Sequence, residues 1–241
     1  MLEEINKFNV YDVNRHKSVG SKSKMLFDEK KNRRLLYTKN LTPGKKFFGE
    51  ELVRERGEEY RSWDVSRSKL GSAIKKGVSQ IGIKDKDIVL YLGAAHGFTS
   101  SYVSDLVGSE GFVFCVDNAP RVVRDLVFVC EERMNMAPIL ADANHPEEYK
   151  DLITKQVDVV FQDIAQRNQV GIFLKNCDAF LKKGGFGLLA VKARSVDVAK
   201  KPHEIFKEVR KQLEQSSMVL VDYRDLEPFE RDHAMFVCKK K

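Results

Sequence analysis

Three aspartates stand where a ligand site of an α/β protein would need acids. Asp117, Asp142 and Asp163 each follow a short apolar run, and Gly93 closes an earlier run, Ile88–Leu92. Continuous apolar runs are typical of strands buried on both faces, and the carboxyl ends of parallel strands meet at one crevice, where open α/β sheets bind ligands. Asp117 comes 24 residues after Gly93, near the offset of roughly 20 at which an acid meets ribose hydroxyls. The pattern predicts a site for a ribose-bearing ligand.

The glycine turn narrows the ligand class. Gly93-Ala94-Ala95-His96-Gly97 runs into an expected helix, where small residues and free N–H groups let a ligand approach. The spacing is GxxxG, so the GxGxxG signature of a pyrophosphate cradle is missing. An adenosine without pyrophosphate fits S-adenosylmethionine better than a nicotinamide cofactor. A nicotinamide-dependent oxidoreductase is the alternative enzyme.

Strands and helices that would position these residues alternate along the chain from about residue 56. We expect strands at 88–92, 112–116, 138–140, 157–161, 186–191, 218–223 and 233–238, and helices at 66–78, 99–107, 121–134, 146–154, 169–181 and 202–215. Repeated βα units predict a mostly parallel, seven-stranded, Rossmann-like sheet with helices on both faces. The last two strands have no helix between them, so we expect an antiparallel pair, as in class I methyltransferases.

The first fifth of the chain follows another pattern. Short runs at Phe8–Val13 and Leu35–Thr38 alternate apolar with polar residues, and Thr42-Pro43-Gly44 is a turn signal. We therefore expect a small β-hairpin domain over residues 1–55, followed by a methyltransferase domain over residues 56–241.

Charge points to an anionic partner. The net charge is +7, and residues 1–50 hold 12 Lys and Arg against 6 Asp and Glu. A basic surface favours nucleic acid, although a solvated face is the alternative. We expect the cluster Lys30, Lys31, Arg33 and Arg34 to support assembly with partners rather than catalysis.

Cysteine spacing and hydropathy indicate the cellular compartment of the protein. The four cysteines form no CxxC pair, so no metal site is expected, and we expect buried, reduced thiols. No apolar stretch approaches the roughly 20 residues of a membrane helix, and Met1 is not followed by a secretory leader. We expect a cytoplasmic protein.

Several segments, in order and at plausible spacing, resemble the fibrillarin family in its archaeal form. The resemblance runs from about residue 35 to the end of the chain. The segments that carry it are Tyr60-Arg61-Ser62-Trp63, Arg67-Ser68-Lys69-Leu70, Leu92-Gly93-Ala94-Ala95, Ala119-Pro120-Arg121, Asp142-Ala143-Asn144, Asp163-Ile164-Ala165-Gln166, Val191-Lys192-Ala193-Arg194-Ser195, Glu227-Pro228-Phe229-Glu230 and Asp232-His233-Ala234-Met235-Phe236-Val237.

The resemblance implies a ribose 2′-O-methyltransferase that uses S-adenosylmethionine on rRNA, tRNA or both. Such proteins are catalytic subunits of a ribonucleoprotein, directed by a box C/D guide RNA that pairs with the substrate. They work beside a Nop-domain scaffold protein and a kink-turn-binding ribosomal-type protein. An RNA-binding assembly subunit without activity is the alternative from another class.

The resemblance also implies which residues bind the cofactor. Together with the glycine turn, the expected set is Gly93, Ala94, Gly97, Phe98, Thr99, Asp117, Asn118, Asp142, Ala143, Asp163, Ile164, Ala165 and Gln166. The family usually has threonine at the position of Phe98, and glutamate with an aromatic residue at Asp117 and Asn118. We expect these departures to alter cofactor affinity rather than cofactor identity.

By the same resemblance, a catalytic tetrad consists of Lys69, Asp163, Lys192 and His233. Lys192 closes an apolar strand at the ligand edge, so we expect it to meet the ribose 2′-hydroxyl. Lys69 would favour loss of its proton and Asp163 would favour keeping it. The sequence leaves open whether Lys192 is a base or a fixed cation. His233 begins a strand, where a histidine is more often structural.

Overall fold

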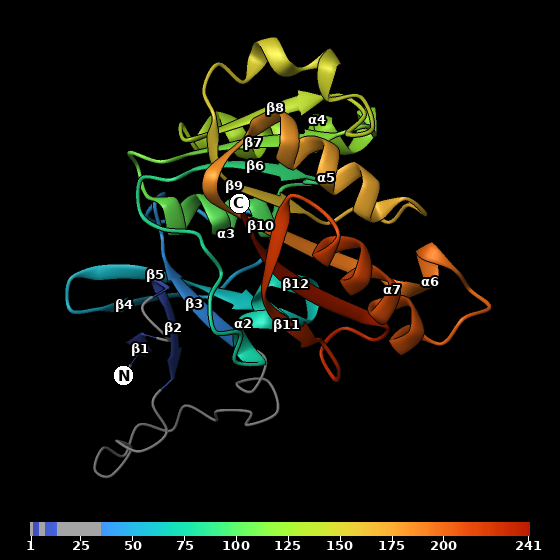
Figure 1. Ribbon diagram of the computed structural model, residues 1–241. Helices are drawn as coiled ribbons and strands as arrows, with labels where there is room; N and C mark the ends of the chain where they lie inside the picture. Colours follow the sequence, from blue (N-terminus) through green and yellow to red (C-terminus); the bar gives the residue numbers. More distant parts are fainter. Residues whose placement is uncertain (1, 5–7, 14–34) are drawn as a thin grey trace.

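Among the residues that the structure describes, seven strands form the larger of two sheets in the computed structural model (Figure 1). Their order across the sheet is β11-β12-β10-β9-β6-β7-β8. The bounds are β6 (Ile88–Leu92), β7 (Phe112–Asp117), β8 (Met136–Leu140), β9 (Val157–Gln162), β10 (Leu181–Lys192), β11 (Met218–Asp225) and β12 (His233–Lys240). Strands β10, β9, β6, β7 and β8 are parallel, and β12 pairs antiparallel with both β10 and β11. The predicted parallel sheet with its terminal antiparallel pair is confirmed.

Helices cover both faces of this sheet because its strands are apolar on both sides. The helices are α2 (Lys69–Lys75), α3 (Phe98–Val107), α4 (Pro120–Glu132), α5 (Gln169–Phe180), α6 (Ala193–Val196) and α7 (Pro202–Glu214). One buried cluster contains residues of α2, α3 and α4, and another contains residues of α5 and α7. Alternate strand residues enter the two clusters: Val89 and Tyr91 the first, Leu90 and Leu92 the second.

A smaller sheet packs on the α2–α3 side. It contains β1 (Leu2–Glu4), β2 (Val10–Val13), β3 (Leu35–Lys39), β4 (Leu52–Glu55) and β5 (Glu58–Asp64), in the order β1-β2-β3-β5-β4. All pairings are antiparallel. Buried Leu36 and Trp63 join the cluster beneath α2 and α3.

The β-rich segment extends beyond residue 55. β5 pairs with both β3 and β4, so a boundary at residue 55 would cut between two hydrogen-bonded strands. We propose that the boundary lies after Asp64. Trp63 and Arg61 of β5 are also buried against α3 of the larger domain, by the stacked Trp63–Tyr102 rings and the Arg61–Ser101 hydrogen bond.

Two expected helices differ from the structure. Residues 146–154 contain the short 3₁₀ segments η3 (Pro146–Glu148) and η4 (Lys150–Leu152) in place of a helix. They are separated by Tyr149, which is fully buried and donates to Asn176. Residues 66–78 are divided at Ser68, whose extended backbone ends η2 (Val65–Arg67) and caps α2. In both cases a residue with a tertiary or capping contact breaks the helical run.

The structure describes residues 2–4, 8–13 and 35–241. The basic cluster Lys30, Lys31, Arg33 and Arg34 lies outside them. Within the described residues, no helix is long and apolar enough to cross a membrane.

Candidate active site

A cavity of about 300 Å³ opens at the carboxyl ends of β6, β7, β8 and β9. The sheet order reverses here, because the chain moves from β6 to β7 and β8 on one side and then crosses to β9 on the other. Such switch points create crevices. The lining residues are Gly93, Ala95, Val116, Asp117, Asn118, Ala141, Asp142, Ala143, Asp163, Ile164, Ala165 and Gln166.

Asp117 is held in place by the backbone. One carboxylate oxygen accepts from Ala95 N at 2.9 Å and the other from Ala119 N at 3.0 Å. A carboxylate has about four acceptor sites, so both oxygens keep capacity for ligand hydroxyls. The first contact also ties the glycine turn after β6 to the end of β7.

Asp142 is the second acid of this cavity. Asn144 donates to the same Asp142 oxygen from its backbone N and from Nδ2, each at 2.9 Å, and these bonds lower the pKa of Asp142. Asn144 Nδ2 also donates to Gln166 at 2.9 Å. The bonds link the loop after β8 to the loop after β9, on opposite sides of the cavity.

A second cavity of about 400 Å³ shares Gly93, Ala95 and Asp163 with the first. Its other lining residues are Phe48, Arg67, Lys69, Tyr91, Ala94, His96, Phe98 and Thr99. The two cavities therefore meet at Asp163. Gly97, expected at the cofactor, lines neither of the two; its left-handed φ of +92° serves the turn into α3.

The aromatic residue at position 98 has a structural explanation. Phe98 packs edge-on against Phe48 and Tyr102, each at 5.3 Å between ring centroids, and the Arg67 guanidinium lies 4.1 Å from its centroid. Thr99 is buried and donates to Ser68 at 3.1 Å. At this turn the Thr99 hydroxyl is therefore used within the protein.

Lys69 and Asp163 form the ion pair at the junction of the cavities. The ammonium lies 3.0 Å from one carboxylate oxygen and 3.1 Å from the other, and both side chains are about one-fifth exposed. Burial opposes the charged form of Lys69, yet Asp163 and Glu230 raise the pKa of Lys69 above its ordinary value. The lysine at this site is therefore a fixed positive charge.

Lys192 and His233 lie side by side on neighbouring strands. They are Cα partners in the antiparallel register of β10 and β12. Lys192 is exposed, and within the described residues no carboxylate forms an ion pair with it. Gln169 fixes its backbone from both sides, accepting from Lys192 N and donating to Lys192 O, each at 3.1 Å.

His233 is buried in surroundings that favour its neutral form. Its Nδ1 donates to Arg231 O at 2.6 Å, because a carbonyl can only accept. Burial and nearby Lys69 lower the pKa of His233. The neutral ring therefore keeps the lone pair on Nε2.

Glu230 is a residue that the sequence analysis did not assign. Its carboxylate lies 3.8 Å from His233 Nδ1. Burial raises the pKa of Glu230 against the opposing influence of Lys69. The signal was present in the Glu227–Glu230 segment, but a carboxylate in a loop shows no periodicity that marks it as part of a site.

The residues present fit S-adenosylmethionine. Two carboxylates that can accept from hydroxyl or amino groups lie in a cavity with small and apolar walls, including Val116, Ala141 and Ile164. Asp163 and Lys69 lie where this cavity meets the second one, whereas Lys192 and His233 line neither cavity; the charges of Lys69, Asp163 and Lys192 nevertheless influence the pKa of His233. The crevice is thus continuous, through Asp163, with a cavity that holds the Lys69–Asp163 ion pair.

Comparisons with known proteins identify the family. A family model described as Fibrillarin matches residues 15–241. A fibrillarin-like rRNA/tRNA 2′-O-methyltransferase of Pyrococcus horikoshii is 47% identical over 229 residues, which cover 95% of this chain and 99% of the relative.

Solved structures agree. A Methanococcus jannaschii fibrillarin pre-rRNA processing protein has a TM-score of 0.87 at 42% identity, covering 100% of this chain and 97% of that one. An Aeropyrum pernix fibrillarin in complex with natively bound S-adenosyl-L-methionine has a TM-score of 0.78 at 44% identity, with 84% and 88% covered. The chain of a fibrillarin/Nop5p complex has a TM-score of 0.78 at 36% identity, with 87% and 98% covered. The chain described here belongs to the fibrillarin family.

Proposed function

We propose that this chain transfers a methyl group from S-adenosylmethionine to ribose 2′-hydroxyls of rRNA and tRNA. The observation that carries the proposal is the junction of the two cavities at Asp163. There the first cavity, which we call the adenosine crevice because Asp117 and Asp142 line it, meets Lys69. The names of the relatives agree with this reaction, and one fibrillarin structure holds the cofactor.

The bound cofactor supplies a methyl group already activated on sulfonium. The ribose oxygen bonds to the methyl carbon while the sulfur–carbon bond breaks, sulfur keeps the electron pair, and the hydroxyl loses its proton. Asp117 and Asp142 bind the adenosine. Asp163, paired with Lys69, lies where this crevice meets the second cavity, in which Phe98 and Thr99 would contact the methionine part of the cofactor. Positioning then supplies most of the rate, since the donor needs no further activation.

Lys192 meets the 2′-hydroxyl in this proposal. It stands at the end of β10 with its backbone fixed by Gln169, so its ammonium can approach RNA from solvent. There Lys192 either accepts the hydroxyl proton as a neutral amine or, as an ammonium, stabilises the negative charge that develops on oxygen. His233, opposite it in register, keeps the same end of the sheet in place.

We further propose that the chain is the catalytic subunit of a box C/D ribonucleoprotein that takes part in pre-rRNA and tRNA processing. A fibrillarin of this fold occurs in complex with Nop5p, which supports a Nop-domain scaffold as a partner. Guide RNA, substrate RNA and a kink-turn-binding ribosomal-type protein complete the proposed assembly. Free, buried cysteines suit the reducing cytoplasm in which we place it.

Methyl transfer from labelled cofactor tests the function. The chain is assembled with guide RNA, Nop-domain protein, kink-turn-binding protein and a substrate RNA complementary to the guide. We expect one labelled ribose 2′-O-methyl group at the guided nucleotide, and none on a substrate that carries a 2′-deoxyribose there. Label on a base, or no label although the complex forms, would overturn the proposal.

A further inference from the structure

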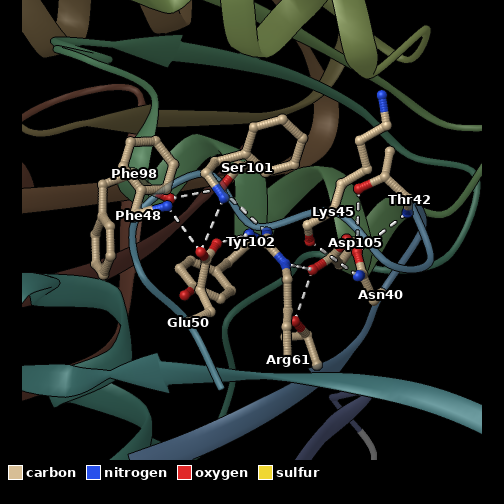
Figure 2. Close-up of polar contacts among 12 residues, drawn as sticks. Asn40, Thr42, Lys45, Phe48, Glu50, Arg61, Phe98, Ser101, Tyr102 and Asp105 are labelled. Carbon is tan, nitrogen blue, oxygen red and sulfur yellow. Dashed lines mark hydrogen bonds and ion pairs between the residues drawn. The ribbon is translucent and has the colours of Figure 1, made fainter. Parts of the chain in front are cut away.

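Arg61 on β5 is fully buried between the small sheet and α3. Its Nε donates to Asp105 at 2.6 Å, Nη1 to Glu50 at 2.8 Å and Nη2 to Ser101 at 3.0 Å. The guanidinium also lies 3.9 Å from the Tyr102 ring centroid. Figure 2 shows Arg61 among these groups, with Asp105 and Ser101 both on α3. One side chain thus joins the small sheet to two turns of the helix.

The charges of this cluster are balanced. Asp105 is buried and also accepts from Arg133 at 2.8 Å and from Thr38 at 2.6 Å. Burial alone would raise the pKa of Asp105, but Arg61 and Arg133 keep it below the ordinary value. A buried charge that loses its partner is strongly destabilising, so this cluster fixes the sheet against α3.

The Ser101 contact continues to the second cavity. Its hydroxyl accepts from Arg61 and donates to Phe98 O at 2.8 Å. Phe98 is the first residue of α3 and lines the second cavity with Thr99. The N-terminus of α3 has no side-chain cap, because Gly97 precedes it. Ser101, itself bonded to Arg61, therefore restrains this turn through the Phe98 carbonyl, by a contact that does not depend on a capping side chain.

We propose that Arg61, acting through Ser101, is a positioning residue that holds the first turn of α3 for binding of S-adenosylmethionine. The small sheet then contributes to cofactor affinity, although no residue of its strands lines either cavity. The inference rests on the proposed function, since it concerns the cofactor named there.

The same helix offers a matched control. Ser104 is buried one turn further on, accepts from Arg133 at 3.0 Å and donates to Asn135 at 2.7 Å. Each serine hydroxyl therefore accepts a hydrogen bond from one buried arginine and donates one to another group of the protein. Neither serine lines a cavity. Loss of either hydroxyl removes similar hydrogen bonds, but only Ser101 reaches the first turn.

The test is calorimetric titration of the full chain with S-adenosylmethionine, for the wild type, Ser101→Ala and Ser104→Ala, with thermal unfolding in parallel. We expect Ser101→Ala to raise the dissociation constant about fivefold to tenfold, as for one lost hydrogen bond. Ser104→Ala should stay within about twofold of the wild type, with a comparable loss of thermal stability. The binding stoichiometry distinguishes two causes of weaker binding. A misfolded fraction of the protein lowers the stoichiometry and leaves the dissociation constant unchanged, whereas a changed site raises the dissociation constant.

An unchanged dissociation constant in Ser101→Ala would overturn the inference, as would an equal rise in Ser104→Ala. Arg61→Lys adds a second readout, because lysine keeps the charge but lacks the planar fork that reaches Asp105, Glu50 and Ser101 together. It should weaken cofactor binding at least as much as Ser101→Ala. A wild-type chain that binds no S-adenosylmethionine contradicts the proposed function itself.

Discussion

The backbone oxygen of Asp163 lies so close to Gly93 that a β-carbon on Gly93 would be 2.3 Å from it. Gly93 also has a left-handed φ of +81°. The ends of β6 and β9 approach each other at the point where the two cavities meet. The position of the Asp163 carboxylate therefore depends on the absence of a side chain at residue 93.

Gly93→Ala should lower the free energy of unfolding by about 2–4 kcal/mol, through the left-handed backbone and the clash with Asp163 O. Gly77→Ala is the control, because Gly77 has a similar φ of +73° but open space around it. It should cost only about 1 kcal/mol. Urea unfolding followed by circular dichroism measures both. Equal losses would show that the close approach carries no energy.

Asp117→Ala should weaken binding of S-adenosylmethionine by about 1.5–3 kcal/mol, because its carboxylate can accept from ribose hydroxyls. Asp151→Ala, at an exposed position outside both cavities, should leave affinity unchanged. Calorimetry measures both. Unchanged affinity in Asp117→Ala would mean that this acid makes no ligand contact. Binding of a nicotinamide dinucleotide in place of the cofactor and its demethylated product would reject the ligand class.

Asp163→Ala should reduce both the rate of transfer and cofactor affinity. Asp163 lines both cavities, and its loss leaves Lys69 without its ion-pair partner. Calorimetry and single-turnover methylation in the assembled complex measure the two effects separately. A variant that loses rate but keeps full affinity would place Asp163 on the substrate side alone.

His233 predicts a dependence of stability on pH. Its folded pKa lies below the ordinary value near 6.5, so below that pH the unfolded chain binds more protons than the folded chain. The contribution of His233 to the free energy of unfolding is therefore fully present above about pH 6.5, and it is lost as the pH falls through the pKa of His233 in the folded chain. The stability difference between the wild type and His233→Gln should be larger at pH 8 than at pH 5, by urea unfolding. A stability difference between the two proteins that does not change with pH would contradict the lowered pKa of His233 in the folded chain.

Strand positions could be predicted because buried parallel strands leave continuous apolar runs. Ile88–Leu92 has the predicted bounds, and the acids after the next three strands line one crevice. Contacts between distant segments could not be predicted. Arg61 bonds Asp105 across 44 positions, and nothing local distinguishes it from a solvated arginine. Tyr149, buried against Asn176, likewise ends a helical pattern for a tertiary reason.

In the proposed reaction Lys192 acts on the RNA hydroxyl, and substitution of Lys192 in the assembled complex tests this role most directly. Single-turnover methyl transfer should fall by about 10² to 10⁴-fold in Lys192→Ala, the usual cost of losing a base or an oxyanion-stabilising charge. Lys183→Ala, an exposed lysine near the other end of β10, is the control and should keep normal turnover. Substantial activity in Lys192→Arg would favour a fixed cation, because arginine keeps its proton. Cofactor affinity should be nearly unchanged in Lys192→Ala, whereas near-normal turnover in that variant would contradict the role assigned to Lys192.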